Sequence, residues 1–80
     1  MVLAFVLIRV GTGEQLNFAK SAKEEIGKIK GVVNVYGVFG RYDLVVLIEA
    51  PTLEELNRII GDKVRAVSGV LSTESLIVGF

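Results

Sequence analysis

The sequence contains no cysteine, no histidine and no tryptophan in 80 residues. Without cysteine, the chain can form neither a disulfide framework nor a thiolate metal site. Without histidine, it lacks the most common general base and the most common metal ligand of proteins. We therefore expect a protein that is not an enzyme and that has no catalytic residues, no metal site and no cofactor.

Net charge is also missing, because nine basic residues balance nine acidic ones at pH 7. A chain without a basic excess has no long-range field that attracts nucleic acid or an anionic membrane. The apolar run at residues 1–8 lacks a basic leader region and is too short to span a bilayer. We expect a cytoplasmic protein that binds neither nucleic acid nor membranes directly.

Apolar residues, in contrast, are abundant and make up 51% of the chain. The length indicates one domain over residues 1–80, and a domain this small buries only about 60 to 65% of its unfolded surface. The apolar excess must then face something else. A partner subunit is the simplest candidate.

Nearly continuous apolar, β-rich runs predict four strands, over residues 2–10, 32–39, 44–49 and 70–80. The first and third runs lack a regular alternation of apolar and polar residues, so we expect both of their faces to be buried. Gly37 makes the second run less regular and suggests a bulge there.

Apolar residues three and four positions apart predict two helices, over residues 14–29 and 53–67. Thr12 is a candidate cap for the first helix, and Thr52 with Glu55 has the spacing of a capping box for the second. Gly61 lies inside the second helical pattern, where it indicates either a kink or a close packing contact.

The predicted order is therefore βαββαβ, and its two halves resemble each other. Residues 29–33 (IKGVV) and 67–71 (VSGVL) repeat the same helix-end, glycine, strand-start pattern 38 residues apart. This predicts an α+β fold, a ferredoxin-like sandwich of a four-stranded antiparallel sheet with two helices on one face. The other face of the sheet would then be apolar and uncovered, which favours packing against a second copy.

The second and third strands meet at a short polar break, where Gly40 suits a tight hairpin turn. Arg41 and Asp43 in this break are two of only five charged residues outside residues 14–30 and 54–65, the two helical windows that hold the other 13. The break is either a recognition site or an ordinary solvated turn. Likewise, Thr73 and Ser75 place hydroxyls near the start of the last strand, where β-propensity alone also explains them.

The sequence around this hairpin resembles a known family. The residues that carry the resemblance are GRYDL at 40–44, GVV at 31–33 and GVLSTES at 69–75. They are similar to the regulatory domain of the Lrp/AsnC (feast/famine) transcription regulators, also called the RAM domain. The match covers essentially the whole chain, but the family's helix-turn-helix is absent, so the chain looks like a stand-alone module.

The resemblance implies a ligand site between dimers of a higher assembly. It would be lined by Gly40, Arg41, Tyr42, Asp43, Thr73 and Ser75. Physically, the Asp43 carboxylate suits the α-ammonium of an amino acid, and backbone N–H groups near Gly40 suit its carboxylate. The resemblance further implies a homodimer through the sheet faces, an octamer or ring of such dimers, and mixed assembly with full-length regulators.

Two alternatives share this topology and stay open on the sequence. One is a small dimeric α+β-barrel enzyme of the monooxygenase or isomerase type. The absence of histidine, cysteine and a converging acid–base pair argues against it. The other is an ACT-like regulatory domain of amino-acid metabolism.

Overall fold

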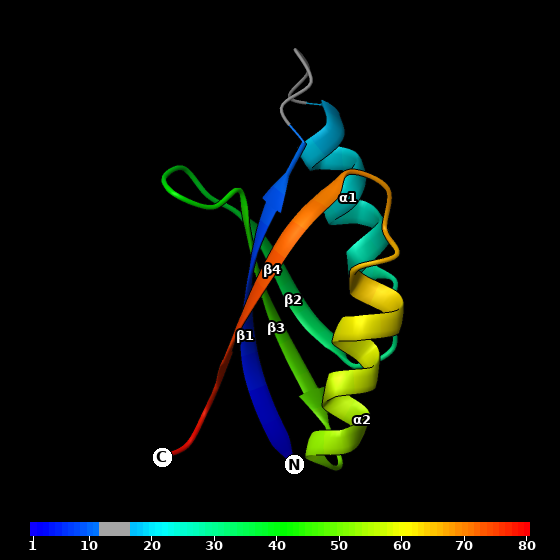
Figure 1. Ribbon diagram of the computed structural model, residues 1–80, viewed down its shortest axis with the longest axis vertical. Coiled ribbons are helices and arrows are strands. Elements are labelled where there is room, and N and C mark those ends of the chain that lie inside the picture. Colours follow the sequence, from blue (N-terminus) through cyan, green and yellow to red (C-terminus); the bar gives the residue numbers. More distant parts are fainter. Residues whose placement is uncertain (12–16) are drawn as a thin grey trace.

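The computed structural model describes residues 1–11 and 17–80, which form a four-stranded antiparallel sheet with its helices on one face (Figure 1). The elements in chain order are β1 (Val2–Val10), α1 (Asn17–Gly27), β2 (Val32–Gly37), β3 (Leu44–Ala50), α2 (Leu53–Arg58), η1 (Ile59–Val64) and β4 (Val70–Ile77). The strands lie in the order β2-β3-β1-β4. The ferredoxin-like α+β prediction is confirmed.

The two faces of the sheet differ in burial. On the helix side, Val6 and Ile8 of β1 and Val46 of β3 are fully buried. They belong to the core, which α1 and α2 close with residues such as Ile26 and Leu56. Because side chains alternate along a strand, the residues between them point to the opposite side.

That opposite side is here called the open face, since both helices lie on the other side of the sheet (Figure 1). Pairing between strands places these apolar side chains on it: Leu3, Phe5, Leu7, Tyr36, Val45, Leu47 and Leu76. Phe5 is 40% exposed, Leu76 49% and Tyr36 51%. We expected both faces of the first and third strands to be buried. Within one chain, β1 and β3 are fully buried only on the helix side of the sheet.

The repeat seen in the sequence is also a repeat in the structure. Gly31 and Gly69 both adopt positive φ angles, 103° and 96°, which side-chain-bearing residues rarely adopt. Each lies in a turn of the same kind: the Val32 N–H donates to the Ile29 carbonyl at 3.1 Å, and the Val70 N–H donates to the Val67 carbonyl at 3.2 Å. The same type of turn, with a glycine at positive φ, thus connects each helical segment to the strand that follows it.

Several boundaries differ from the predictions. β2 ends at Gly37 and β4 at Ile77, each earlier than predicted. The irregularity in β2 lies between Val32 and Asn34, while Gly37 pairs in register with Leu44, so placing the bulge at Gly37 was wrong. The proposed Thr12 cap and the start of the first helix lie outside the described residues.

The second helix begins as predicted and then changes its winding. The Thr52 hydroxyl accepts a hydrogen bond from the Glu55 N–H at 3.1 Å, which confirms the predicted cap. After Arg58 the helix continues as the π-helical segment η1. Gly61 lies within η1, and a Cβ added there would meet no atom of the surrounding structure within 4 Å, so the glycine does not mark a close packing contact. Among the described residues, no helix is long and apolar enough to cross a membrane.

Candidate functional site

The connection between β2 and β3, residues 38–43, projects beyond the sheet as a loop (Figure 1). The Val38 N–H donates to the Asp43 carbonyl at 2.9 Å, which closes the loop. The Asp43 N–H donates to the Ile8 carbonyl, also at 2.9 Å, which ties the loop to β1. Gly40 lies near the tip with a φ of 141°, and an added Cβ there would meet no atom within 4 Å. Glycine is thus required at Gly40 by backbone conformation, not by crowding.

The Asp43 side chain has a structural contact that sequence reasoning did not anticipate. Its Oδ2 accepts a hydrogen bond from the Val10 N–H at 2.8 Å, across 33 residues of sequence. Val10 is buried, so this carboxylate satisfies a backbone donor that has little access to water. Asp43 is itself only half-buried. Its carboxylate can therefore hold the end of β1 and still face a ligand with its remaining acceptor capacity.

A cavity of about 340 Å³ lies beside this contact. Its lining consists of Arg9, Val10, Gly40, Arg41, Asp43, Leu71 and Ser72. Two guanidinium groups and one carboxylate thus share a small space with a glycine backbone and a hydroxyl. These groups match the needs of a zwitterion, because Arg9 and Arg41 suit a carboxylate and Asp43 suits an ammonium group.

Tyr42 lies next to this cavity but does not line it. Its hydroxyl donates a hydrogen bond to Glu74 Oε1 at 2.5 Å. This hydrogen bond, followed by desolvation and the charge of Glu74, raises the pKa of Tyr42 above its usual value. The pair joins the hairpin to β4, so Tyr42 positions the loop in the structure of one chain.

Thr73 and Ser75 lie elsewhere, because the register of β4 turns them to the helix side of the sheet. Thr73 pairs with Ile8 and Ser75 pairs with Val6, and both partners are core residues. Neither hydroxyl residue lines the hairpin cavity. The structure thus brings Gly40, Arg41 and Asp43 together and leaves Thr73 and Ser75 apart from them within one chain.

Sequence reasoning missed two polar residues that do line the cavity, Arg9 and Ser72. They lie directly opposite each other, on β1 and β4. Ser72 belongs to the same polar segment as Thr73 and Ser75, but the two sets point to opposite faces. Only the pairing register distinguishes them.

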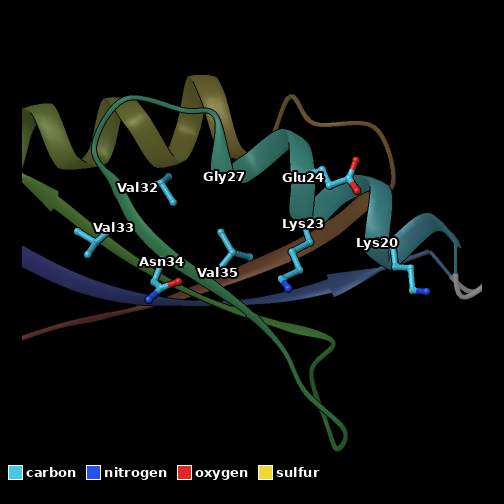
Figure 2. Close-up of a pocket in the computed structure, with 8 residues that line it drawn as sticks. All are labelled: Lys20, Lys23, Glu24, Gly27, Val32, Val33, Asn34 and Val35. Carbon is cyan, nitrogen blue, oxygen red and sulfur yellow. The ribbon is translucent and has the colours of Figure 1, made fainter.

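Two larger cavities lie away from the hairpin. One of about 540 Å³ is lined by residues of α1 and β2, among them Lys20 and Lys23, and Lys23 extends beside Val35 (Figure 2). Another, of about 740 Å³, lies where the α1–β2 turn meets the second helix. Neither was anticipated from the sequence.

Known proteins match the chain over nearly its whole length. The family model described as the Lrp/AsnC ligand binding domain matches residues 3–79. The HTH-type transcriptional regulator FL11 of Pyrococcus furiosus is 38% identical over 77 residues, which cover 96% of this chain and 48% of the regulator. The chain thus spans about half the length of the curated relatives it matches.

Solved structures share the whole architecture. TTHA0845 from Thermus thermophilus superposes with a TM-score of 0.88 at 35% identity, covering 100% of this chain and 95% of that one. The transcriptional regulator NMB0573 of Neisseria meningitidis, in complex with L-Met, superposes with a TM-score of 0.85 at 14% identity. That match covers 99% of this chain and 50% of the regulator, and at this identity it shows the fold alone.

Proposed function

The chain belongs to the Lrp/AsnC family, whose ligand-binding domain it matches, and from that premise we propose that it is a non-enzymatic sensor of a small molecule, most simply an amino acid. In this proposal the protein acts in the cytoplasm as a sheet-to-sheet dimer. Its ligand binds at the hairpin between β2 and β3, and ligand binding changes how dimers associate with one another or with full-length regulators of the family.

The observation that carries the proposal is the hairpin cavity. It gathers Arg9, Arg41 and Asp43 around about 340 Å³, although the chain has only five charged residues outside residues 14–30 and 54–65. A free amino acid presents one carboxylate and one ammonium group on the same carbon. Two cations beside one anion can bind both groups with charge-assisted hydrogen bonds.

The open face supports the dimer. Phe5, Leu76 and Tyr36 are between 40% and 51% exposed on it, whereas soluble monomers seldom expose a continuous apolar face of this kind. Burying a large apolar side chain contributes about 1.5 to 3 kcal/mol. A second copy related by a two-fold axis would bury these residues against their own counterparts.

The placement of Thr73 and Ser75 fits a site that is completed by a neighbouring dimer. Both residues lie on the helix side of β4, apart from the cavity of their own chain. In a higher assembly, such as an octamer or a ring, they would face the hairpin of another copy. The six residues Gly40, Arg41, Tyr42, Asp43, Thr73 and Ser75 then remain one proposed ligand site, shared between subunits.

An amino acid is the first ligand class to test for two reasons. The charges of the cavity suit a zwitterion, and a regulator with the same fold, NMB0573, has been solved as a complex with L-Met. The side-chain preference of this protein depends on residues that a neighbouring subunit supplies.

The proposal is tested by isothermal titration of the assembled protein with each of the twenty amino acids. We expect saturable binding of at least one of them. An amino-acid amide, which lacks the carboxylate, serves as a matched control and should bind more weakly than its parent. Heats that never saturate for any amino acid would contradict the proposal.

A further inference from the structure

The cavity of about 740 Å³ lies at the end of the sheet that is remote from the hairpin. It is lined by Met1, Pro51 and Glu55, by residues 28–31 of the α1–β2 turn, by Glu49 near the end of β3, and by Arg58, Ile59 and Lys63 of the second helix. None of these residues lines the hairpin cavity. Any ligand of this cavity would therefore be separate from the proposed amino-acid site.

The wall of this cavity is firmly built. The Glu49 N–H donates to the Gly31 carbonyl at 2.8 Å and fixes the turn to β3. A Cβ at Gly31 would lie 2.9 Å from Ile59 Cδ1, so the absence of a side chain there lets Ile59 pack directly on the turn. Ile59 is only 6% exposed. The basic side chains around it therefore project from a well-defined support.

The lining carries a positive excess, although the whole chain is neutral. Four basic residues line the cavity, Lys28, Lys30, Arg58 and Lys63, against the two acidic residues Glu49 and Glu55. Arg58 is paired with Glu55 at 2.5 Å, and Lys28 with Glu25 at 3.5 Å. Among the residues that the structure describes, no acidic group lies within ion-pair distance of Lys30 or Lys63.

The positive charge of Lys30 acts on Glu55, which also lines the cavity. The pKa of Glu55 is lowered chiefly by its hydrogen bond to Arg58, and the charges of Arg58 and Lys30 lower it further. The lowered pKa favours the charged form of Glu55, which is already paired with Arg58. By residue count, the lining has two more basic than acidic side chains.

The second helix changes its winding at this cavity. η1 supplies Ile59 and Lys63, and the Arg65 N–H donates to the Ile60 carbonyl at 3.1 Å, five residues back. π-helical turns are rare and occur frequently at functional sites. Ile59 and Lys63 of this segment, an apolar and a cationic residue four positions apart, both line the cavity.

We propose that this cavity binds a small organic dianion, a phosphomonoester or a dicarboxylate. Lys30 and Lys63 bind the negative groups, and Ile29 and Ile59 contact the apolar part of the ligand. The site goes beyond the proposed amino-acid site and shares no residue with it. Ammonium groups hold compact anions as point charges, which suits a phosphate or a carboxylate equally.

The proposal is tested by isothermal titration of the wild-type protein at low ionic strength with inorganic phosphate, AMP and succinate as probes. We expect saturable binding of AMP or of succinate with a Kd below about 1 mM. AMP as the tighter ligand identifies a phosphomonoester site, and succinate identifies a dicarboxylate site. Inorganic phosphate binding as tightly as the better organic ligand would overturn the role of the apolar wall.

Two variants and two controls locate the binding. Lys30→Gln and Lys63→Gln should each weaken the better ligand about tenfold or more, because each removes a charge-assisted contact. Lys20→Gln and Lys23→Gln remove the same charge at the other cavity and should leave the Kd unchanged. No saturable binding of any probe, or equal weakening in all four variants, would overturn the site. Amino-acid binding should be the same in all four, so the two proposals fail separately.

Discussion

Asp43 is predicted to have two roles that substitution can separate. Its Oδ2 holds the Val10 N–H at 2.8 Å, and its charge is the proposed partner of a ligand ammonium group. Asp43→Ala removes both. Asp43→Asn keeps a side-chain carbonyl that can accept the same hydrogen bond and removes only the charge.

The structural loss can be estimated from the buried donor. Val10 is 5% exposed, so without the carboxylate its N–H is left largely unsatisfied, at a cost of about 1 to 3 kcal/mol. A domain of this size loses about 4 to 8 °C in Tm for each kcal/mol. We expect Asp43→Ala to unfold at a visibly lower temperature, whereas Asp43→Asn should unfold close to wild type.

Ligand affinity should depend on the charge of Asp43 and not on the hydrogen bond to Val10. Removing a charge-assisted hydrogen bond costs about 1.5 to 3 kcal/mol, which weakens the ligand by about 10- to 150-fold. Asp43→Asn should therefore lose amino-acid affinity while staying folded. Asp62→Asn, which changes the only other aspartate and lies exposed on the second helix, is the matched control for both assays.

Thermal unfolding followed by circular dichroism gives the stability of each variant, and calorimetric titration gives its affinity. Unchanged affinity in Asp43→Asn would refute the ammonium contact. An unchanged Tm in Asp43→Ala would refute the structural one.

The remaining predictions concern assembly, the turn and nucleic acid. Phe5→Glu places a charge on the open face and should convert the dimer to a smaller species in sedimentation at low micromolar concentration; a folded wild-type monomer there would contradict the dimer. Gly31→Ala should lower the Tm, because φ is 103° and its Cβ would meet Ile59 Cδ1 at 2.9 Å, while Gly27→Ala, with open space around it, should not. Thr73→Val should weaken the ligand less than Asp43→Asn does in the same titration. The purified protein should give no sequence-selective gel shift with duplex DNA, and a salt-sensitive selective shift would refute this.

Much of the fold could be predicted because local signals agree with one another. Glycine between a helical pattern and a strand pattern occurs twice, and Gly31 and Gly69 both adopt the positive φ that only glycine accepts readily. The apolar runs over residues 2–10 and 44–49 also predicted the two strands that lie in the centre of the sheet, β1 and β3, although the sequence did not indicate the strand order.

The candidate site was less predictable because it depends on register. A regular strand that starts with Val70 facing the core would turn Ser72 and Glu74 toward the core as well. In the structure Val70 pairs with Val10, but Ser72 pairs with Arg9, so Leu71 is an extra residue in β4. One extra residue exchanges the two faces for the rest of the strand. Thr73 consequently lies on the helix side, and no local pattern in the sequence indicates this.

The π-helical segment η1 was also not predictable from the sequence pattern. Gly61 was interpreted as a kink or a close packing contact, and the sequence pattern did not indicate the i to i−5 hydrogen bond from the Arg65 N–H to the Ile60 carbonyl. The contact between the Asp43 carboxylate and Val10 joins residues 33 apart, and a long-range contact of this kind has no local signal either.

The central claim is that an amino acid binds at the hairpin between copies of this chain, and a crystal structure of the complex tests it most directly. Crystals would be grown with the amino acid that binds in the titration. The account predicts a two-fold dimer packed through the open face. The ligand ammonium group would lie at Asp43, its carboxylate near Arg9 or Arg41, and Thr73 or Ser75 of a neighbouring dimer beside it. An amino acid bound within one chain away from the hairpin, or an open face exposed to solvent, would contradict the account.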